Sequence, residues 1–508
     1  MVAAPRSGAT GAVRLAGNGA FLLGAVGLLV LAARIGFTNL SHYNNNYDEG
    51  VYLESVRLMR HGYPLYRAVF ASQPPLWFLF LDASFSLFGE SVRSGRLVTV
   101  AGALLAVGAV ILAGQQLRGR LAGSLAGALV MLSPFYLLTS RSVEAESPST
   151  PLAALGVALV AVYFRQGRRV WWFLAVLAVT AGVMVKLFAV YAYAPLALLA
   201  VGRWWTAETT WHRRLQGVLL DAGLAALLVV GICAAFALAL GPGLVWNQVV
   251  TFHVAARGAY QPLGTWENAR LLYSFLKAEP LLVPAAPLAL LCLGGGWRGL
   301  AAMLWLVSAV TGAVGQHPLF DHHSASVIPP LALAIGVGWG QLPAAARALF
   351  RRARERQGGH AVAITGAATV FSLVSALSLA LLLPRVQPAW LALGRLDRSS
   401  GDNSVDVQLA GIVDARTVPG DSILTDQQTI AFWAQRDVPP GLTDTSFVRI
   451  ASHYLTADQV IRQSTASQVK VAVLASGRLR QLPAALRWVE QSFPHHLDLG
   501  QGRVVYWK

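Results

Sequence analysis

Ionisable side chains gather at a few points of a chain that is otherwise largely apolar. They are the acidic pair Asp48 and Glu49, the group Arg141, Glu144 and Glu146, the single Lys186, the loop residues His253 and Arg257, and the histidine-rich group His317, Asp321, His322 and His323. Carboxylates can take a proton from an attacking group, and cations can stabilise an anionic one. The residue types therefore suit proton transfer beside a charged substrate.

Each of these clusters also has a purely structural interpretation. Asp48 and Glu49 could open a helix, since acids favour helix starts. Lys186 could be a lysine that extends to the membrane interface. The histidine group could consist of ordinary loop side chains, or it could bind zinc together with Asp321, although its spacing is not a recognised ligand pattern. The sequence leaves these alternatives, and a dependence on a divalent metal, open.

The composition predicts a protein with many membrane spans. Of the 508 residues 55% are hydrophobic and 13% are charged, whereas about a quarter of an ordinary soluble domain is charged. A disordered chain, a coiled coil, a collagen and a plain soluble enzyme are thereby excluded. The net charge of +16 does not indicate a nucleic-acid partner, because arginine concentrates in short links between apolar runs, where the positive-inside rule places it.

The apolar runs predict about eleven spans, with the N-terminus in the cytoplasm. The expected spans are 15–36, 95–116, 121–140, 149–164, 170–185, 187–202, 216–240, 281–296, 299–315, 327–342 and 361–383. The apolar segment 75–89 is short for a span and carries Asp82, so we interpret it as an interfacial or re-entrant helix of the first outer loop. If it does not cross, every basic link falls inside, the ionisable clusters fall outside, and so does the C-terminal part.

The composition changes near residue 387, where charged and polar residues become more frequent. We therefore divide the chain into a membrane module, 1–386, and a small extracytoplasmic α/β domain, 387–508. The segments 421–425 and 469–474 are typical of short buried strands. Asp426, Trp433, Arg436 and Tyr454 are the domain's candidate contact residues, and the domain could either bind an acceptor or act as a structural lid.

The first outer loop resembles that of the GT-C glycosyltransferases, and most closely the protein mannosyltransferase and aminoarabinose transferase superfamily. The resemblance rests on an acidic pair after the first span, Asp48–Glu49, on Gln73–Pro74–Pro75–Leu76–Trp77, and on Leu87–Phe88–Gly89. Further matches are Arg96–Leu97, Arg141 with an acid after it, Val183–Met184–Val185–Lys186, and Ile328–Pro329–Pro330 after the histidines. The family often has Lys or His where this chain has Gln73. A GT-C fold is therefore expected.

The resemblance implies a polyprenyl-phosphate-linked sugar as donor and a glycan, lipid or protein as acceptor, in the plasma (inner) membrane. Asp48 is the expected base, with Glu49, Glu144 or Glu146 as partners in catalysis, and a single displacement predicts inversion. The residues expected to bind the donor phosphate are Arg141, Lys186, His253, Gln73 and Arg57. Those expected to bind substrate are Tyr47, Tyr52, Tyr66, His317, Asp321, His322 and His323.

Two other functions stay open at this point. A transporter or flippase for a lipid-linked intermediate would need inverted repeats or broken helices around a central site, and the sequence shows neither. A non-catalytic membrane subunit that holds an assembly together would not need the ionisable clusters to meet.

Overall fold

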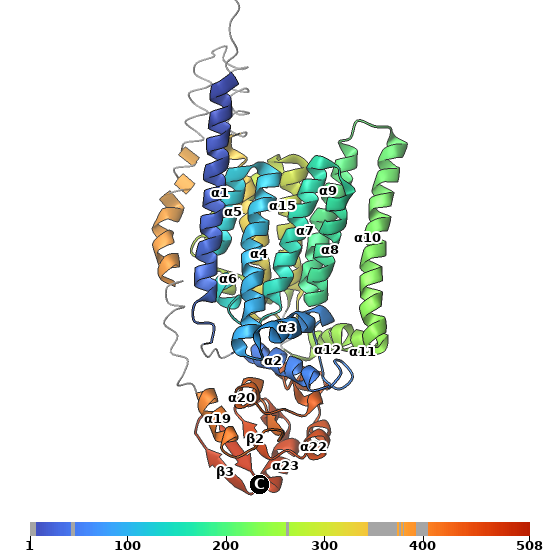
Figure 1. The fold of residues 1–508 in the computed structure, drawn as a ribbon, viewed down its shortest axis with the longest axis vertical. Coiled ribbons are helices and arrows are strands. Elements are labelled where there is room, and N and C mark those ends of the chain that lie inside the picture. Colours follow the sequence, from blue (N-terminus) through green and yellow to red (C-terminus); the bar gives the residue numbers. More distant parts are fainter. Residues whose placement is uncertain are drawn as a thin grey trace, which may run out of the picture.

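A computed structural model describes residues 7–41, 46–260, 264–343, 373–374, 377–378, 380–392 and 405–508. A bundle of long helices forms one end of the molecule and a small domain with a four-stranded sheet forms the other (Figure 1). A layer of short helices lies between the two. The expected fold class, a helical membrane protein with a C-terminal α/β domain, is confirmed.

The bundle contains the helices that the apolar runs predict. Its main elements are α1 (Ser7–Phe37), α4 (Val92–Arg118), α5 (Arg120–Met131), α6 (Pro134–Thr139), α7 (Glu146–Gln166), α8 (Arg169–Val185), η1 (Leu187–Ala192), α9 (Tyr193–Trp205), α10 (Trp211–Leu240), α13 (Thr265–Leu276), α14 (Leu282–Ala285), η3 (Ala286–Gly294), α15 (Gly296–Gly315), η4 (Asp321–Val327) and α16 (Ile328–Trp339). Within the described residues, six helices are long and apolar enough to cross a membrane. The expected spans up to 327–342 coincide with helices or pairs of short helices. The span 361–383 lies largely outside the described residues, so the number of spans stays a prediction.

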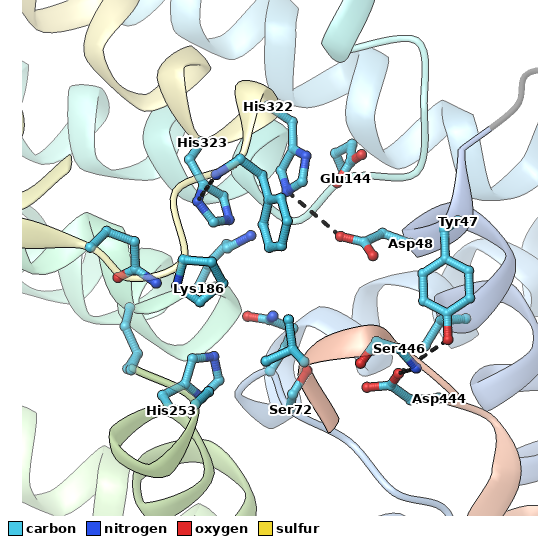
Figure 2. A pocket seen from close by; sticks show the side chains of 18 of the residues that line it. Tyr47, Asp48, Ser72, Glu144, Lys186, His253, His322, His323, Asp444 and Ser446 are labelled. Carbon is cyan, nitrogen blue, oxygen red and sulfur yellow. Dashed lines mark hydrogen bonds and ion pairs between the residues drawn. The ribbon is translucent and has the colours of Figure 1, made fainter. Parts of the chain in front are cut away.

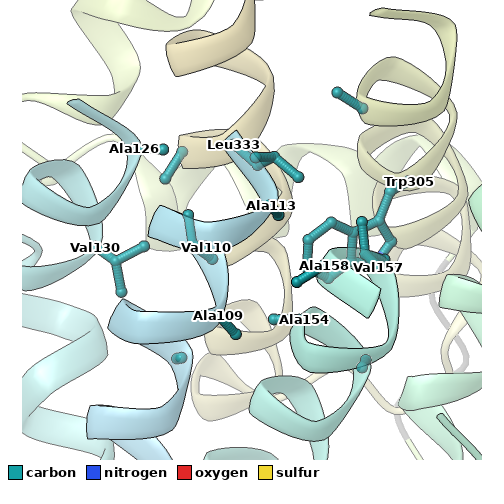
Figure 3. Close-up of a cluster of buried hydrophobic side chains, with 14 of the residues drawn as sticks. Ala109, Val110, Ala113, Ala126, Val130, Ala154, Val157, Ala158, Trp305 and Leu333 are labelled. Atoms are coloured by element: carbon teal, nitrogen blue, oxygen red, sulfur yellow. The ribbon is translucent and has the colours of Figure 1, made fainter. Parts of the chain in front are cut away.

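Small residues let the central helices approach closely. Ala113 of α4 and Ala154 and Ala158 of α7 are fully buried among their neighbours (Figure 3). A Cβ atom on Gly102 would lie 2.3 Å from the carbonyl oxygen of Ser147. Helices in lipid associate by such close packing, because lipid offers no hydrophobic gain for burying larger apolar side chains. The contact at Gly102 fixes the start of α7, where an acidic residue of the site lies.

Short helices cover the end of the bundle that faces the C-terminal domain. They are α2 (Tyr47–Arg60), α3 (Pro75–Phe88), α11 (Pro242–Trp246), η2 (Asn247–Thr251) and α12 (Phe252–Ala259), and they lie beneath the bundle (Figure 1). Asn46 caps α2 by accepting a hydrogen bond from the backbone N–H of Glu49 at 2.9 Å. The apolar segment after Pro74 forms the 14-residue α3, as expected of an interfacial helix in this loop.

The C-terminal domain is a sheet packed against helices. Its strands β1 (Ile423–Thr425), β2 (Val471–Leu474), β3 (His495–Asp498) and β4 (Val504–Trp507) follow the order β1-β2-β4-β3, with β1 parallel to β2 and the other pairs antiparallel. The helices are α19 (Val405–Asp414), α20 (Gln428–Ala434), α21 (Phe447–Ala451), α22 (Ala457–Ala466) and α23 (Pro483–Ser492). Both predicted strands are confirmed as β1 and β2, and the final hairpin was not expected.

Helix α2 attaches the domain to the bundle. Arg57 pairs with Asp437 at 3.1 Å, and the backbone N–H of Val438 donates to Glu54 at 3.1 Å. Burial raises the pKa of Glu54 to about 8, so this carboxyl group is neutral at physiological pH. One turn earlier, a Cβ on Gly50 would lie 2.4 Å from the backbone nitrogen of Thr429 in α20. The N-terminal half of α2 therefore lies directly against the C-terminal domain.

Candidate active site

A cavity of about 570 Å³ opens where the bundle, the short helices and the C-terminal domain meet. This size is within the range of ligand pockets. The lining residues come from α2 and the residue before it, from the loops before α3 and α7, from η1 and the residue before it, from α12, from the segment 316–323, and from the C-terminal domain around the start of α21 and after β2. Figure 2 shows that their polar side chains point into one shared space. Residues far apart in the sequence are thus brought together at one end of the bundle.

Two carboxylates face this cavity beside a histidine. Asp48 Oδ2 lies 3.6 Å from His322 Nε2 (Figure 2). Ligand atoms of Asp48, Glu144 and His322 all lie within 4.8 Å of one another. Burial raises the pKa of Asp48, although His322 and Lys186 act in the opposite direction. Burial also raises the pKa of Glu144 to about 8. Both carboxylates therefore bind a proton more readily than an exposed acid.

Two cations of the cavity, Lys186 and His322, come from the helix bundle. Lys186 forms an ion pair with the buried Glu146, which lies behind it at the start of α7. Burial alone lowers the pKa of His322, but the surrounding carboxylates, Glu144 first, outweigh it and raise the pKa to about 10. Burial and neighbouring cations lower the pKa of His323, and they lower that of His253 to about 4. Lys186 and His322 are thus the cationic groups here, whereas the other two imidazoles are neutral.

Most of the residues predicted to bind substrate, and some of those predicted to bind the donor phosphate, line this cavity. Those in its wall are Tyr47, Tyr52, Gln73, His253, His317, Asp321, His322 and His323, together with Asp48, Glu144 and Lys186. Tyr66 is not among the lining residues; its hydroxyl donates to the carbonyl of Gln73 at 2.7 Å and so holds that residue in place.

Three further predicted residues have contacts elsewhere among the described residues. Glu49 accepts two hydrogen bonds from Arg96, at 2.8 and 2.6 Å, and both side chains are almost completely buried. Arg141 is buried and donates to the carbonyl of Thr38. Arg57 contacts the C-terminal domain, as described above. None of the three is among the residues that line the cavity.

The contact residues suggested for the C-terminal domain are not among the residues that line the cavity. Asp426 accepts hydrogen bonds from backbone N–H groups of its own domain, and Arg436 pairs with Asp414 at 2.8 Å. Trp433 packs against the apolar core, and the Tyr454 hydroxyl donates to Asn247.

Other parts of the domain supply the lining instead. They are Asp444 and Ser446 in the loop before α21, Phe447 and Val448 at the start of α21, and Arg478 after β2. These residues were not predicted from the sequence, and neither were the aromatic residues Phe188, Tyr191, Phe252 and Tyr260 of the membrane module. One signal was available, because Arg478 follows the parallel strand β2, and ligands of α/β domains bind beyond the carboxyl ends of such strands.

Among the described residues, two groups of side chains have the geometry to hold a metal ion. They are Glu146, His322 and His323 in one group, and Asp48, Glu144 and His322 in the other. In the first group Glu146 already forms an ion pair with the Lys186 ammonium, which would have to move away before a metal could bind. His322 belongs to both groups and would have to give up its proton to become a ligand. The donor sets fit a divalent metal only after these changes.

The comparisons with known proteins agree with this architecture. Residues 72–238 match the family model described as dolichyl-phosphate-mannose-protein mannosyltransferase. The structure of ArnT from Cupriavidus metallidurans, bound to undecaprenyl phosphate, has a TM-score of 0.62 and 16% identity, and the match covers 95% of this chain and 97% of that one. AglB from Archaeoglobus fulgidus, in complex with an inhibitory peptide and a dolichol-phosphate, has a TM-score of 0.54 and 12% identity, covering 92% of this chain and 72% of that one.

No curated protein matches the chain in sequence. At identities this low, likeness to the solved structures establishes the fold, and the family model adds the match over 72–238. The expected resemblance is thereby confirmed at the level of the fold, and the chain has the GT-C fold of these solved structures.

Proposed function

We propose that this protein is a glycosyltransferase that moves a sugar from a polyprenyl-phosphate donor to an acceptor hydroxyl on the outer face of the membrane. The observation that carries the proposal is the position of Asp48, whose carboxylate shares a cavity with the cations Lys186 and His322. A base beside two cations suits the departure of a phosphate group. The similar structures of ArnT and AglB, which hold undecaprenyl phosphate and dolichol-phosphate, support such a donor.

In this mechanism Asp48 takes the proton of the acceptor hydroxyl as its oxygen attacks the anomeric carbon of the donor sugar. The bond between that carbon and the phosphate oxygen breaks, and the polyprenyl phosphate leaves as an anion. Lys186 and His322 stabilise the developing charge, so no general acid is needed. A single displacement of this kind inverts the anomeric configuration.

The edge of the cavity suits a lipid-linked donor. Leu187 and Val190 of η1 line the cavity, and their exposed fractions are 39% and 46%. Leu187 directly follows Lys186 in the chain, and Val190 lies four positions after it. A phosphate held by this lysine would therefore have apolar side chains beside it, where the first isoprene units of a polyprenyl chain leave the site.

The experiment is sugar transfer by the purified protein in lipid nanodiscs. Radiolabelled polyprenyl-phosphate sugars are supplied as donors, a membrane extract supplies acceptors, and both products are identified. We expect Asp48→Asn to lower the rate by about 10²–10⁴-fold, the usual contribution of a general base, while binding of undecaprenyl phosphate is retained. The matched control is Asp82→Asn, which removes an exposed carboxylate of α3 outside the cavity lining.

The alternatives give different results in the same preparation. A flippase would move the lipid-linked sugar across the bilayer without forming a new glycosidic bond. A scaffold subunit would show neither transfer nor sensitivity to Asp48→Asn. Full transfer activity in the Asp48→Asn protein would exclude this residue as the base.

A further inference from the structure

Arg478 of the C-terminal domain places a guanidinium group in the wall of the cavity. Its Cζ atom lies 3.6 Å from the centre of the Tyr47 ring and 5.1 Å from that of Phe447. Stacking of this kind attracts the cation to the ring face and limits its freedom to move. The group is therefore held in one orientation before any ligand arrives.

The guanidinium retains most of its capacity to donate hydrogen bonds. Among the described residues it donates two long hydrogen bonds, 3.4 Å each, to the Asp426 carbonyl and the Gln427 side chain. Across the part of the chain that the structure describes, no carboxylate lies within ion-pair distance of Arg478, and its buried Nε has no hydrogen-bond partner. Burial of a donor without a partner is costly. An oxyanion in the cavity would supply both the missing counter-charge and an acceptor for the guanidinium N–H groups.

The position of Arg478 separates it from the donor side. Tyr47 and Asp48 are consecutive residues of α2, so their side chains leave the helix about 100° apart. Asp48 points toward His322, whereas Tyr47 points toward Asp444 of the C-terminal domain (Figure 2). Lys186 lies across the cavity from Tyr47 in the same view. The proposed base therefore stands between the cations of the membrane module and the guanidinium that covers Tyr47.

We propose that Arg478 binds an oxyanion of the acceptor, and that the acceptor is an acidic saccharide with a carboxylate or phosphate near the reacting hydroxyl. The assignment to the acceptor rests on the proposed function. A guanidinium suits both oxyanions, because it presents two parallel N–H donors.

Other parts of this wall suit the sugar ring itself. The ring planes of Tyr260 and Phe447 are parallel, with their centres 6.3 Å apart. They offer flat apolar surfaces to the ring, while Asp444 and Ser446 can accept hydrogen bonds from its hydroxyl groups.

The test measures binding to the full-length protein in detergent by titration calorimetry. The probes are an oligosaccharide ending in glucuronate, the same oligosaccharide ending in a 6-phosphorylated glucose, and the neutral form. We expect one of the acidic probes to bind about 10- to 100-fold more tightly than the neutral one, the usual effect of a charge-assisted hydrogen bond. The glucuronate and phosphate arms distinguish the two sources of the oxyanion.

Arg478→Gln should abolish this preference. The control is Arg480→Gln, in the same loop, because Arg480 is exposed and donates to the Gly502 carbonyl. If the glutamine variant does not fold, Arg478→Lys replaces it. Lysine keeps the positive charge but lacks the two parallel N–H donors, so the preference for the acidic probe should fall several-fold.

Several results would overturn the proposal. They are equal affinity of the wild-type protein for acidic and neutral probes, an unchanged preference in the Arg478 variants, and equally tight Arg478-dependent binding of an acidic peptide. A loss of undecaprenyl phosphate binding in Arg478→Gln would instead assign the guanidinium to the donor. Because binding is measured without sugar transfer, failure of this proposal is distinguishable from failure of the proposed function.

Discussion

Replacing Glu49 tests whether the second acid of the Asp48–Glu49 pair holds α2 in place or takes part in the chemistry. Glu49 accepts hydrogen bonds from Arg96 Nε and Nη2, and from the backbone N–H of Val143 at 2.9 Å. Arg96 is completely buried, and its Nη1 donates to the carbonyl of Leu40 at 2.8 Å. The pair therefore ties together the segment before α2, α2 itself, α4 and the loop before α7.

The structure allows the effect to be estimated. Removal of one partner from a buried ion pair costs about 3–5 kcal/mol, because the other charge is left uncompensated. We therefore expect Glu49→Gln to lower the free energy of unfolding by about 3 kcal/mol. Arg96→Met should cost a similar amount. The double variant should cost less than the sum of the two, by about 0.5–3 kcal/mol, because it leaves no unpaired charge.

The assay combines unfolding by SDS in mixed micelles with sugar transfer per folded molecule. The control is Asp82→Asn, which breaks the exposed pair with Arg60 and should cost at most about 1 kcal/mol. If Glu49→Gln unfolds like the wild-type protein but abolishes transfer, the structural role is refuted and Glu49 belongs to the catalytic groups.

Two further predictions concern the cavity and its boundary. Donor phosphate affinity should fall as pH rises from 7 to 11, first near 8, where Glu144 becomes an anion, and again near 10, where His322 loses its charge. Undecaprenyl phosphate binding across this range measures both steps, and His322→Gln should bind more weakly than the wild-type protein at pH 7. Gly50→Ala should loosen the C-terminal domain, since its Cβ would meet the backbone of Thr429 at 2.4 Å, whereas Gly24→Ala has open space. Limited proteolysis between the domains measures the difference, and equal cleavage of both variants would contradict the packing argument.

The sequence predicted the convergence of the ionisable clusters because a membrane strongly restricts where charges can lie. Charge at membrane depth is costly, so apolar runs and arginine-rich links assign each cluster to one side. Asp48 and His322 are almost 275 positions apart in the sequence, and Glu144 lies between them. The ligand atoms of all three nevertheless lie within 4.8 Å of one another. The short α3 was predictable for the same reason, since its length is too small for a span.

The division of roles within a cluster was not predictable. Asp48 and Glu49 are both acids in the first turn of α2, and a sequence does not show which face of that helix meets Arg96. Only the packing shows that Glu49 faces the buried arginine and Asp48 the cavity. Arg141 illustrates the same limit, because its position near the acids suggested phosphate binding and its guanidinium contacts the backbone of Thr38.

The residues of the C-terminal domain were missed for a further reason, which follows from how α2 is built into the molecule. Tyr47, Asp48 and Gly50 lie within one helical turn, and each faces a different neighbour: Arg478, His322 and Thr429. The contact between Gly50 and Thr429 determines how the C-terminal domain lies on α2, and so which of its residues reach the cavity. This contact joins two parts of the chain far apart in the sequence, so the sequence does not reveal it. The same turn therefore positions Asp48, the proposed base, relative to His322, and the C-terminal domain relative to Asp48. A rotation of α2 that moved Asp48 from His322 would also separate Tyr47 from Arg478, because both side chains leave the same turn of the helix.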